Sequence, residues 1–142
     1  MKNGLGNWAR WALLAGLVGL LLAGAPLMLA ASPSDIQQVR FTRSAGQWRV
    51  DVTIRHADTG WEHYTNVWVV ETMEGKLLGK RVLYHPHVSE QPFTRSHTVT
   101  IPRGISKVRV RAGDNVDGIS SNTVMVDLTQ ESGDRFQVSG NR

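Results

Sequence analysis

The chain has 142 residues, and its sixteen Lys and Arg against twelve Asp and Glu give a formal charge of +4. This length suits one domain. Because Lys2 and Arg10 lie in an N-terminal segment without acidic residues, the rest carries only +2, which excludes a polybasic nucleic-acid binder. A content of 41% hydrophobic residues excludes a disordered chain. The absence of cysteine excludes a disulfide scaffold, a thiolate nucleophile and a Cys-ligated metal site.

The first part of the chain has the pattern of an export signal. Lys2 and Arg10 precede an uncharged, apolar stretch that runs from Trp11 to Ala31 and ends in small residues. We expect a signal peptide over residues 1–31. The alternative is an uncleaved membrane anchor, because the apolar run reaches the ~20 residues that span a bilayer. Both interpretations place the rest of the chain outside the cytoplasm, in the periplasm or secreted, with membrane contact only through an uncleaved N-terminal segment.

From residue 34 onward the apolar residues alternate with polar ones, which predicts short strands. Residues 36–43 form the first candidate, and residues 47–55 form the clearest one, with Trp48, Val50, Val52 and Ile54 on one face. Residues 64–72 are more uniformly apolar, as in a central strand covered on both faces. The remaining candidates follow at 77–84, 94–101, 106–112 and 122–128, and turn residues separate them all.

Seven short strands without a helical segment between them favour an all-β fold, an antiparallel sandwich over residues 32–128. A small barrel with the same number of strands is the alternative. Residues 129–142 are polar except for Phe136 and Val138. We therefore expect these last residues to form a flexible tail.

Taken in order, the strands resemble an immunoglobulin-like or fibronectin-type-III-like domain with Trp68 as the buried aromatic residue of the third strand. The stretch Glu62-His63-Tyr64, which leads into that strand, resembles the desulfoferrodoxin-type superoxide reductases. The Ig-like domain of that family holds iron with histidines and one cysteine. Here Asn115-Val116-Asp117-Gly118 stands where the family has its cysteine and a histidine. This departure removes the sulfur ligand and argues against iron-based superoxide chemistry, whereas the resemblance in fold does not depend on it.

Histidines are the strongest candidates for chemistry. His85 and His87 flank a proline, and alternate side chains of an extended segment point the same way. Both could bind one ion with a third ligand from His63 or His97 and a nearby carboxylate, Glu62 or Glu90. Such nitrogen and oxygen ligands suit copper or zinc, and also non-haem Fe(II). The alternative is that both histidines lie unliganded in a solvent-exposed turn.

The remaining histidines carry weaker signals. We expect His56 and His97 each to lie at a strand end or to face outward rather than to bind a metal. The pairs Asp58 with Glu62 and Asp114 with Asp117 lie in turns, where Asp is common for backbone reasons. We therefore expect no catalytic residues.

The segment from Tyr84 to Arg95 combines aromatic, proline and charged residues in a loop, which is how rigid sandwiches build binding sites. We expect Tyr84, Phe93 and Arg95 to form a recognition surface with Trp61 and Glu62 beside it. The alternative is a bent crossover between the sheets, with Phe93 filling the core.

Our first hypothesis is thus a non-enzymatic, exported binding or accessory module of the bacterial envelope. Its partner would be an envelope protein or a small ligand, and not nucleic acid. The second is a periplasmic metal-binding protein that uses His63, His85 and His87 to hold copper or zinc. The third is a small redox enzyme that depends on the same metal.

Overall fold

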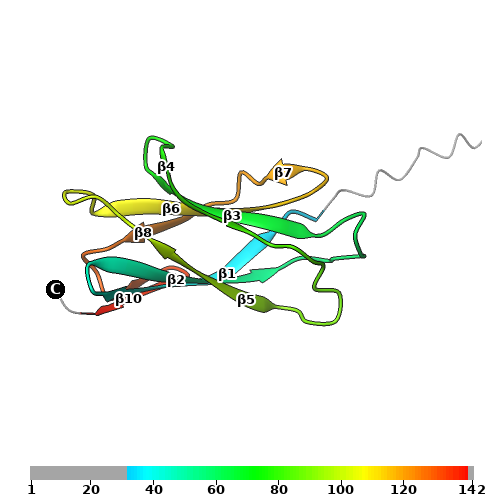
Figure 1. Ribbon diagram of the computed structural model, residues 1–142, viewed down its shortest axis with the longest axis horizontal. Helices are drawn as coiled ribbons and strands as arrows, with labels where there is room; N and C mark the ends of the chain where they lie inside the picture. Colours follow the sequence, from blue (N-terminus) through cyan, green and yellow to red (C-terminus); the bar gives the residue numbers. More distant parts are fainter. Residues whose placement is uncertain (1–31, 141–142) are drawn as a thin grey trace, which may run out of the picture.

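The computed structural model describes residues 32–140, which form two β-sheets stacked as a sandwich (Figure 1). This confirms the predicted all-β class. The predicted export segment, residues 1–31, lies outside the described residues and stays a prediction. Within residues 32–140 there is no helix that is long and apolar enough to cross a membrane.

Each sheet is assembled from five strands of the described chain. The first has the order β5-β2-β1-β10-β9, and the second has the order β4-β3-β6-β7 with β8 also paired to β6. The strands of the first sheet are β1 (Asp35–Ser44), β2 (Gln47–Arg55), β5 (Phe93–Val99), β9 (Ser132–Gly133) and β10 (Phe136–Gly140). Those of the second sheet are β3 (Thr65–Thr72), β4 (Leu77–Val82), β6 (Lys107–Asp114), β7 (Gly118–Ile119) and β8 (Val124–Asp127). All seven predicted strands are present.

A two-residue turn joins β1 to β2. Ala45 and Gly46 both have positive φ angles, 49° and 78°, as a type I′ hairpin turn requires. This turn fixes the register, so that Phe41 of β1 lies opposite Val50 of β2. The hairpin therefore places the apolar residues of both strands on the same face.

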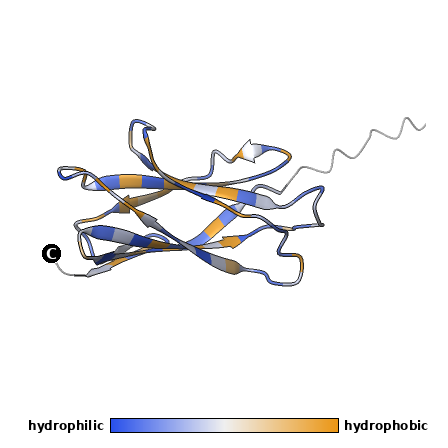
Figure 2. Cartoon of the chain, viewed as in Figure 1, coloured by the Kyte–Doolittle hydropathy of each residue, from blue (hydrophilic) through white to orange (hydrophobic). Residues whose placement is uncertain are grey.

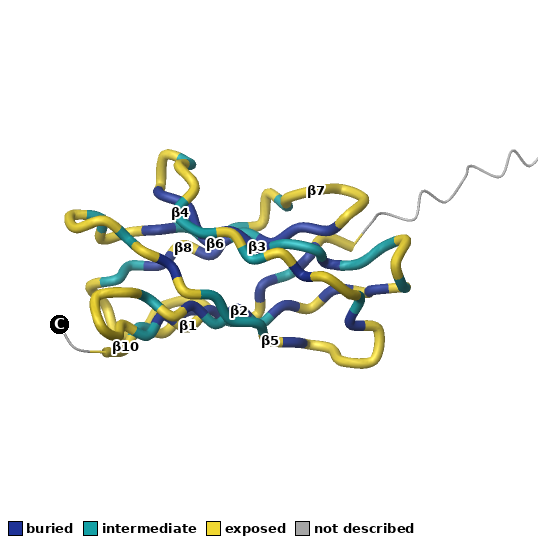
Figure 3. Tube along the Cα trace, viewed as in Figure 1, coloured by how far each residue is buried: buried dark blue, intermediate teal, exposed yellow. Residues whose placement is uncertain are grey.

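The core lies between the two sheets and follows the period of two seen in the sequence. Apolar and polar positions alternate along the strands (Figure 2), and buried positions alternate with more exposed ones along β2 (Figure 3). Trp68 of β3 is fully buried, as predicted. The largest fully buried side chains are Trp68, Phe41, Phe93, Ile36, Ile54, Val39, Val50, Val52, Val70, Val99, Val108 and Val110.

Strand β3 is also covered on its outer face, which explains its uniformly apolar sequence. Val69 lies opposite Arg111 of β6 and is 5% exposed. Beside it, Glu71 accepts hydrogen bonds from Arg109 Nε at 2.8 Å and from Arg111 Nη2 at 2.8 Å. The hydrogen bond from Arg111 is the largest cause that lowers the pKa of Glu71 below its usual value. One buried carboxylate thus ties the two arginines of β6 to β3.

The end of the chain differs from the prediction of a flexible tail. Residues 136–140 form β10, which pairs in parallel with β1, with Phe136 opposite Val39. Phe136 is 6% exposed and belongs to the core. The physical reason is that Phe136 and Val138, two residues apart, share one face of a strand and cover the edge of β1. The sandwich therefore extends to residue 140 and includes one parallel strand pair.

Candidate functional site

Polar side chains gather at the end of the sandwich where β2 and β6 end and β3 begins. His56 follows β2 directly, His63 lies just before β3, and Asp114 is the last residue of β6. The antiparallel pairing of β3 with β6 sets Thr65 opposite Asp114. Because β2 belongs to the other sheet, the cluster joins both layers of the sandwich.

The two imidazoles face the same carboxylate. His63 Nε2 lies 3.4 Å from Asp114 Oδ1, and His56 Nε2 lies 3.9 Å from Asp114 Oδ2. The side chains of His56 and Asp114 are 0% and 2% exposed, whereas that of His63 is 24% exposed. Both Nε2 atoms are buried and make no hydrogen bond within the described residues. Buried polar atoms are rarely left unpaired, so these two nitrogens require an explanation.

The ring of His56 is held in place by a second buried carboxylate. Asp58 Oδ1 lies 2.6 Å from His56 Nδ1. An ionised carboxylate only accepts hydrogen bonds, so in the neutral form of the imidazole Nδ1 carries the proton and Nε2 offers its lone pair. A carboxylate behind a histidine is the arrangement found around metal-binding histidines, where it fixes the tautomer and the ring orientation.

Backbone hydrogen bonds fix the loops around the cluster. The Val116 and Asp117 amides donate to Asp114 Oδ1 at 2.9 and 2.8 Å. Asn115 Oδ1 accepts from the Tyr64 amide at 2.8 Å, which ties the loop after β6 to the segment before β3. At the same end, the buried Ser34 hydroxyl lies 2.8 Å from that of Thr65. These hydrogen bonds hold the loop after β6 and the segment before β3 in place around the cluster.

The cluster has the composition of a metal site. One ligand atom from each of His56, His63 and Asp114 can be chosen so that all lie within 4.8 Å of one another. A tetrahedral zinc ion with ligands at about 2.0–2.1 Å holds them about 3.4 Å apart. The distance from His63 Nε2 to Asp114 Oδ1, 3.4 Å, already meets this value, whereas the widest pair, up to 4.8 Å apart, must close by up to about 1.4 Å. Two imidazoles and one carboxylate suit zinc, copper and non-haem Fe(II).

Of the three histidines predicted from the sequence to bind a metal ion, one belongs to this cluster. His63 belongs to the cluster, but His85 and His87 are not part of it. His85 is exposed, and its ring centroid lies 4.6 Å from that of His87. His87 is 4% exposed and stacks on Phe93 with the ring centroids 3.8 Å apart. Burial, the largest cause, lowers the pKa of His87 below its usual value.

His56 lies at a strand end, as the sequence predicts, because it follows β2 directly. It does not face outward, since it is 3% exposed and its ring faces Asp114. The physical reason is that the chain turns inward directly after Arg55, where Asp58 binds the imidazole. Asp114 does make the local backbone contact expected of a turn residue, because it accepts from the Val116 amide, whereas Asp58 accepts from the distant amides of Thr65 and His87. Each also faces a histidine, which turn statistics alone do not reveal.

The predicted recognition residues divide into exposed and buried ones. Trp61 and Tyr84 are 68% and 75% exposed, and Glu62 is also exposed. Arg95 is half-buried and forms an ion pair with Glu90 at 2.9 Å. Phe93 is 1% exposed, so it fills the core and is corrected as a surface contact. Its ring is part of the hydrophobic core, as the alternative interpretation expected.

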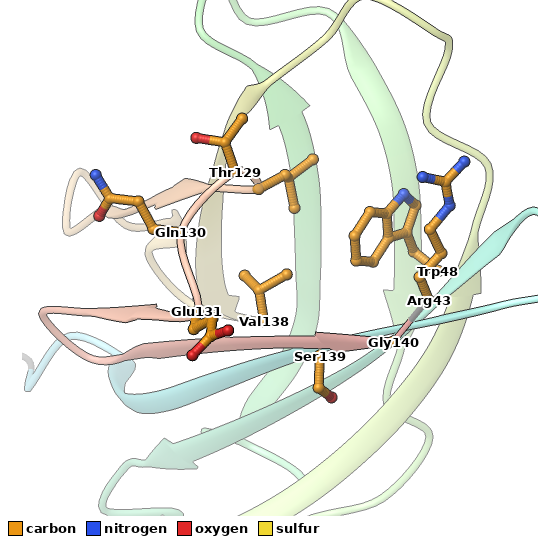
Figure 4. A pocket seen from close by; sticks show the side chains of 9 residues that line it. Arg43, Trp48, Thr129, Gln130, Glu131, Val138, Ser139 and Gly140 are labelled. Carbon is orange, nitrogen blue, oxygen red and sulfur yellow. The ribbon is translucent and has the colours of Figure 1, made fainter. Parts of the chain in front are cut away.

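A separate hollow of about 580 Å³ lies at the opposite end of the sandwich (Figure 4). Trp48 and Arg43 stand side by side on one wall, with the guanidinium carbon 5.7 Å from the Trp48 ring centroid. Thr129 and Gln130 lie on the other wall. We call this the Trp48 hollow. No residue predicted from the sequence to bind a ligand lines it.

Comparison with known proteins finds a similarity to a protein of Halomicrobium mukohataei named "Putative lipoprotein". The two are 43% identical over 93 residues, which cover 64% of this chain and 45% of that protein. The chain thus spans less than half the length of the relative it matches. No family model matches the chain. No solved structure matches it either.

Proposed function

We propose that this chain is an exported, Ig-like accessory module of the cell envelope that binds a copper or zinc ion through His56, His63 and Asp114. Export is supported by the N-terminal sequence pattern and by the name of the relative. The observation that carries the metal site is the pair of buried Nε2 atoms without hydrogen bonds that flank one carboxylate. A bound ion would take up both lone pairs and the carboxylate charge.

Calorimetric titration of the purified full-length protein with Zn²⁺ and Cu²⁺ tests this function. We expect one ion per chain and a melting temperature that rises with metal, since an ion at 100 times its Kd stabilises the fold by about 2.7 kcal/mol. His63→Gln removes one ligand from the partly exposed side of the site. His85→Gln is the matched control, because His85 is exposed and lies outside the cluster.

The outcomes separate the two ligand sets. Loss of binding in His63→Gln with normal binding in His85→Gln supports the cluster. Equal loss in both variants favours the set of His63, His85 and His87 that the sequence suggested. A wild-type protein that binds neither ion, and whose melting temperature ignores both, contradicts the function as a whole.

A second candidate function, recognition of an envelope partner or small ligand, is favoured by the exposed aromatic side chains of Trp61 and Tyr84. Both project from loops of a rigid sandwich. Site-specific photo-crosslinking in intact cells from position 84 tests it, with position 100, exposed beyond β5, as the control. We expect adducts from position 84 alone. An identical adduct pattern from both positions contradicts this function.

A further inference from the structure

We propose that Asp58 is a positioning residue through which occupancy of the metal site controls the order of the loop between β4 and β5. This inference rests on the proposed metal function and adds a regulatory consequence to it. The loop comprises residues 83–92, and it includes Tyr84, whose side chain is 75% exposed. In this scheme the metal ion determines whether the surface of the loop is held in one conformation.

Asp58 connects three segments of the chain with one buried side chain, which is 0% exposed. Its Oδ1 lies 2.6 Å from His56 Nδ1 and accepts from the Thr65 amide at 3.0 Å. Its Oδ2 accepts from the amide of His87 at 2.7 Å. The same carboxylate therefore orients a metal ligand and anchors the middle of the loop.

A second connection runs beside the first. The amide of His56 donates to Gln91 Oε1 at 3.0 Å, and Gln91 Nε2 donates to the His87 carbonyl at 3.1 Å. The loop is thus attached to the segment 56–58 at both His87 and Gln91. A change in the position of His56 must be shared by the loop or must break these hydrogen bonds.

Metal binding acts on this link through His56. An ion on His56 Nε2 makes Nδ1–H a stronger donor, which tightens the hydrogen bond to Asp58. A more firmly held Asp58 keeps its second oxygen in place for the amide of His87. Coupling between two sites is reciprocal, so a loosened loop must weaken metal binding by the same factor.

Hydrogen exchange of the full-length protein with and without saturating Zn²⁺ tests the link. We expect Zn²⁺ to slow exchange of the His87 amide and its neighbours in residues 84–92 by about tenfold. Asp58→Asn should abolish this slowing at Zn²⁺ concentrations that saturate the variant. Asp117→Asn is the matched control, because Asp117 is an exposed aspartate near the same site. It should retain the slowing.

Gln91→Ala provides a test that does not depend on the folding of the Asp58 variant, because Gln91 is exposed. Reciprocity predicts a Zn²⁺ affinity lower by several-fold, although Gln91 is not a ligand. Zn²⁺ that binds normally without slowing exchange in residues 84–92 overturns this inference and leaves the metal function intact. An unchanged Zn²⁺ affinity in Gln91→Ala also overturns it. Absence of Zn²⁺ binding overturns both.

Discussion

Replacement of Phe136 by alanine measures how far the C-terminal strand contributes to the fold. Phe136 is 6% exposed and lies opposite Val39 of β1. A Cβ added to Gly133 would overlap the Phe136 ring, so the ring is packed closely beneath β9. Truncation of a buried Phe to Ala costs about 3–5 kcal/mol. Because β10 has only the two-residue β9 on its outer side, we expect the lower value, about 3 kcal/mol.

Urea denaturation followed by tryptophan fluorescence gives this free energy of unfolding. A loss of about 3 kcal/mol corresponds to a fall in melting temperature of roughly 10–15 °C for a domain of this size. Gln137→Ala is the matched control, because Gln137 is the next residue of the same strand and is exposed. If Phe136→Ala and Gln137→Ala agree within about 0.5 kcal/mol, β10 does not stabilise the sandwich and the reasoning fails.

Three further substitutions test other contacts. Glu71→Gln leaves Arg109 and Arg111 without their carboxylate and should lower the free energy of unfolding by about 1 kcal/mol. Glu74→Gln, at an exposed position, should leave it unchanged. Equal effects of both variants in chemical denaturation would refute this. Gly79→Ala places a Cβ 2.6 Å from Val99 Cγ2 and should lower the free energy of unfolding by about 1–3 kcal/mol. In a double-mutant cycle, the same substitution should lower it less when Val99 is already replaced by alanine. The pKa of His87 is lowered in the folded state, so unfolding takes up a proton and the free energy of unfolding falls below pH ~6.5. In His87→Phe this free energy should decline less between pH 7 and 5. An unchanged decline would exclude His87 as its source.

The strands were predictable because their signal is local. Alternation in residues 47–55 and 106–112 fixes which side chains face the core, and the Ala45-Gly46 turn separates the first two strands. The C-terminal strand was not predicted because its alternating pattern has only two apolar residues, Phe136 and Val138. Its stability comes from β1, which lies about a hundred residues earlier in the chain. Sequence periodicity does not reveal such a long-range parallel pairing.

The candidate site was predictable only in part for a similar reason. His85 and His87 attracted attention because they are close in the sequence, and periodicity says that such residues share a face. His56 and Asp114 are 58 positions apart, and only the meeting of β2, β3 and β6 at one end brings them together. Asp114 was not singled out, because an aspartate in a turn is already explained by its backbone contacts. The resemblance around His63 pointed to the end of the molecule where the cluster lies, without identifying the other residues of the cluster.

The buried hydrogen bond between Ser34 and Thr65 bears on how the sandwich would be oriented if it were attached through its N-terminal side. It brings the start of the described chain to the histidine end, whereas Gly140 lies at the far end, beside the Trp48 hollow. A tether joined ahead of Ser34 would keep the histidines close to its attachment point and direct Trp48 outward.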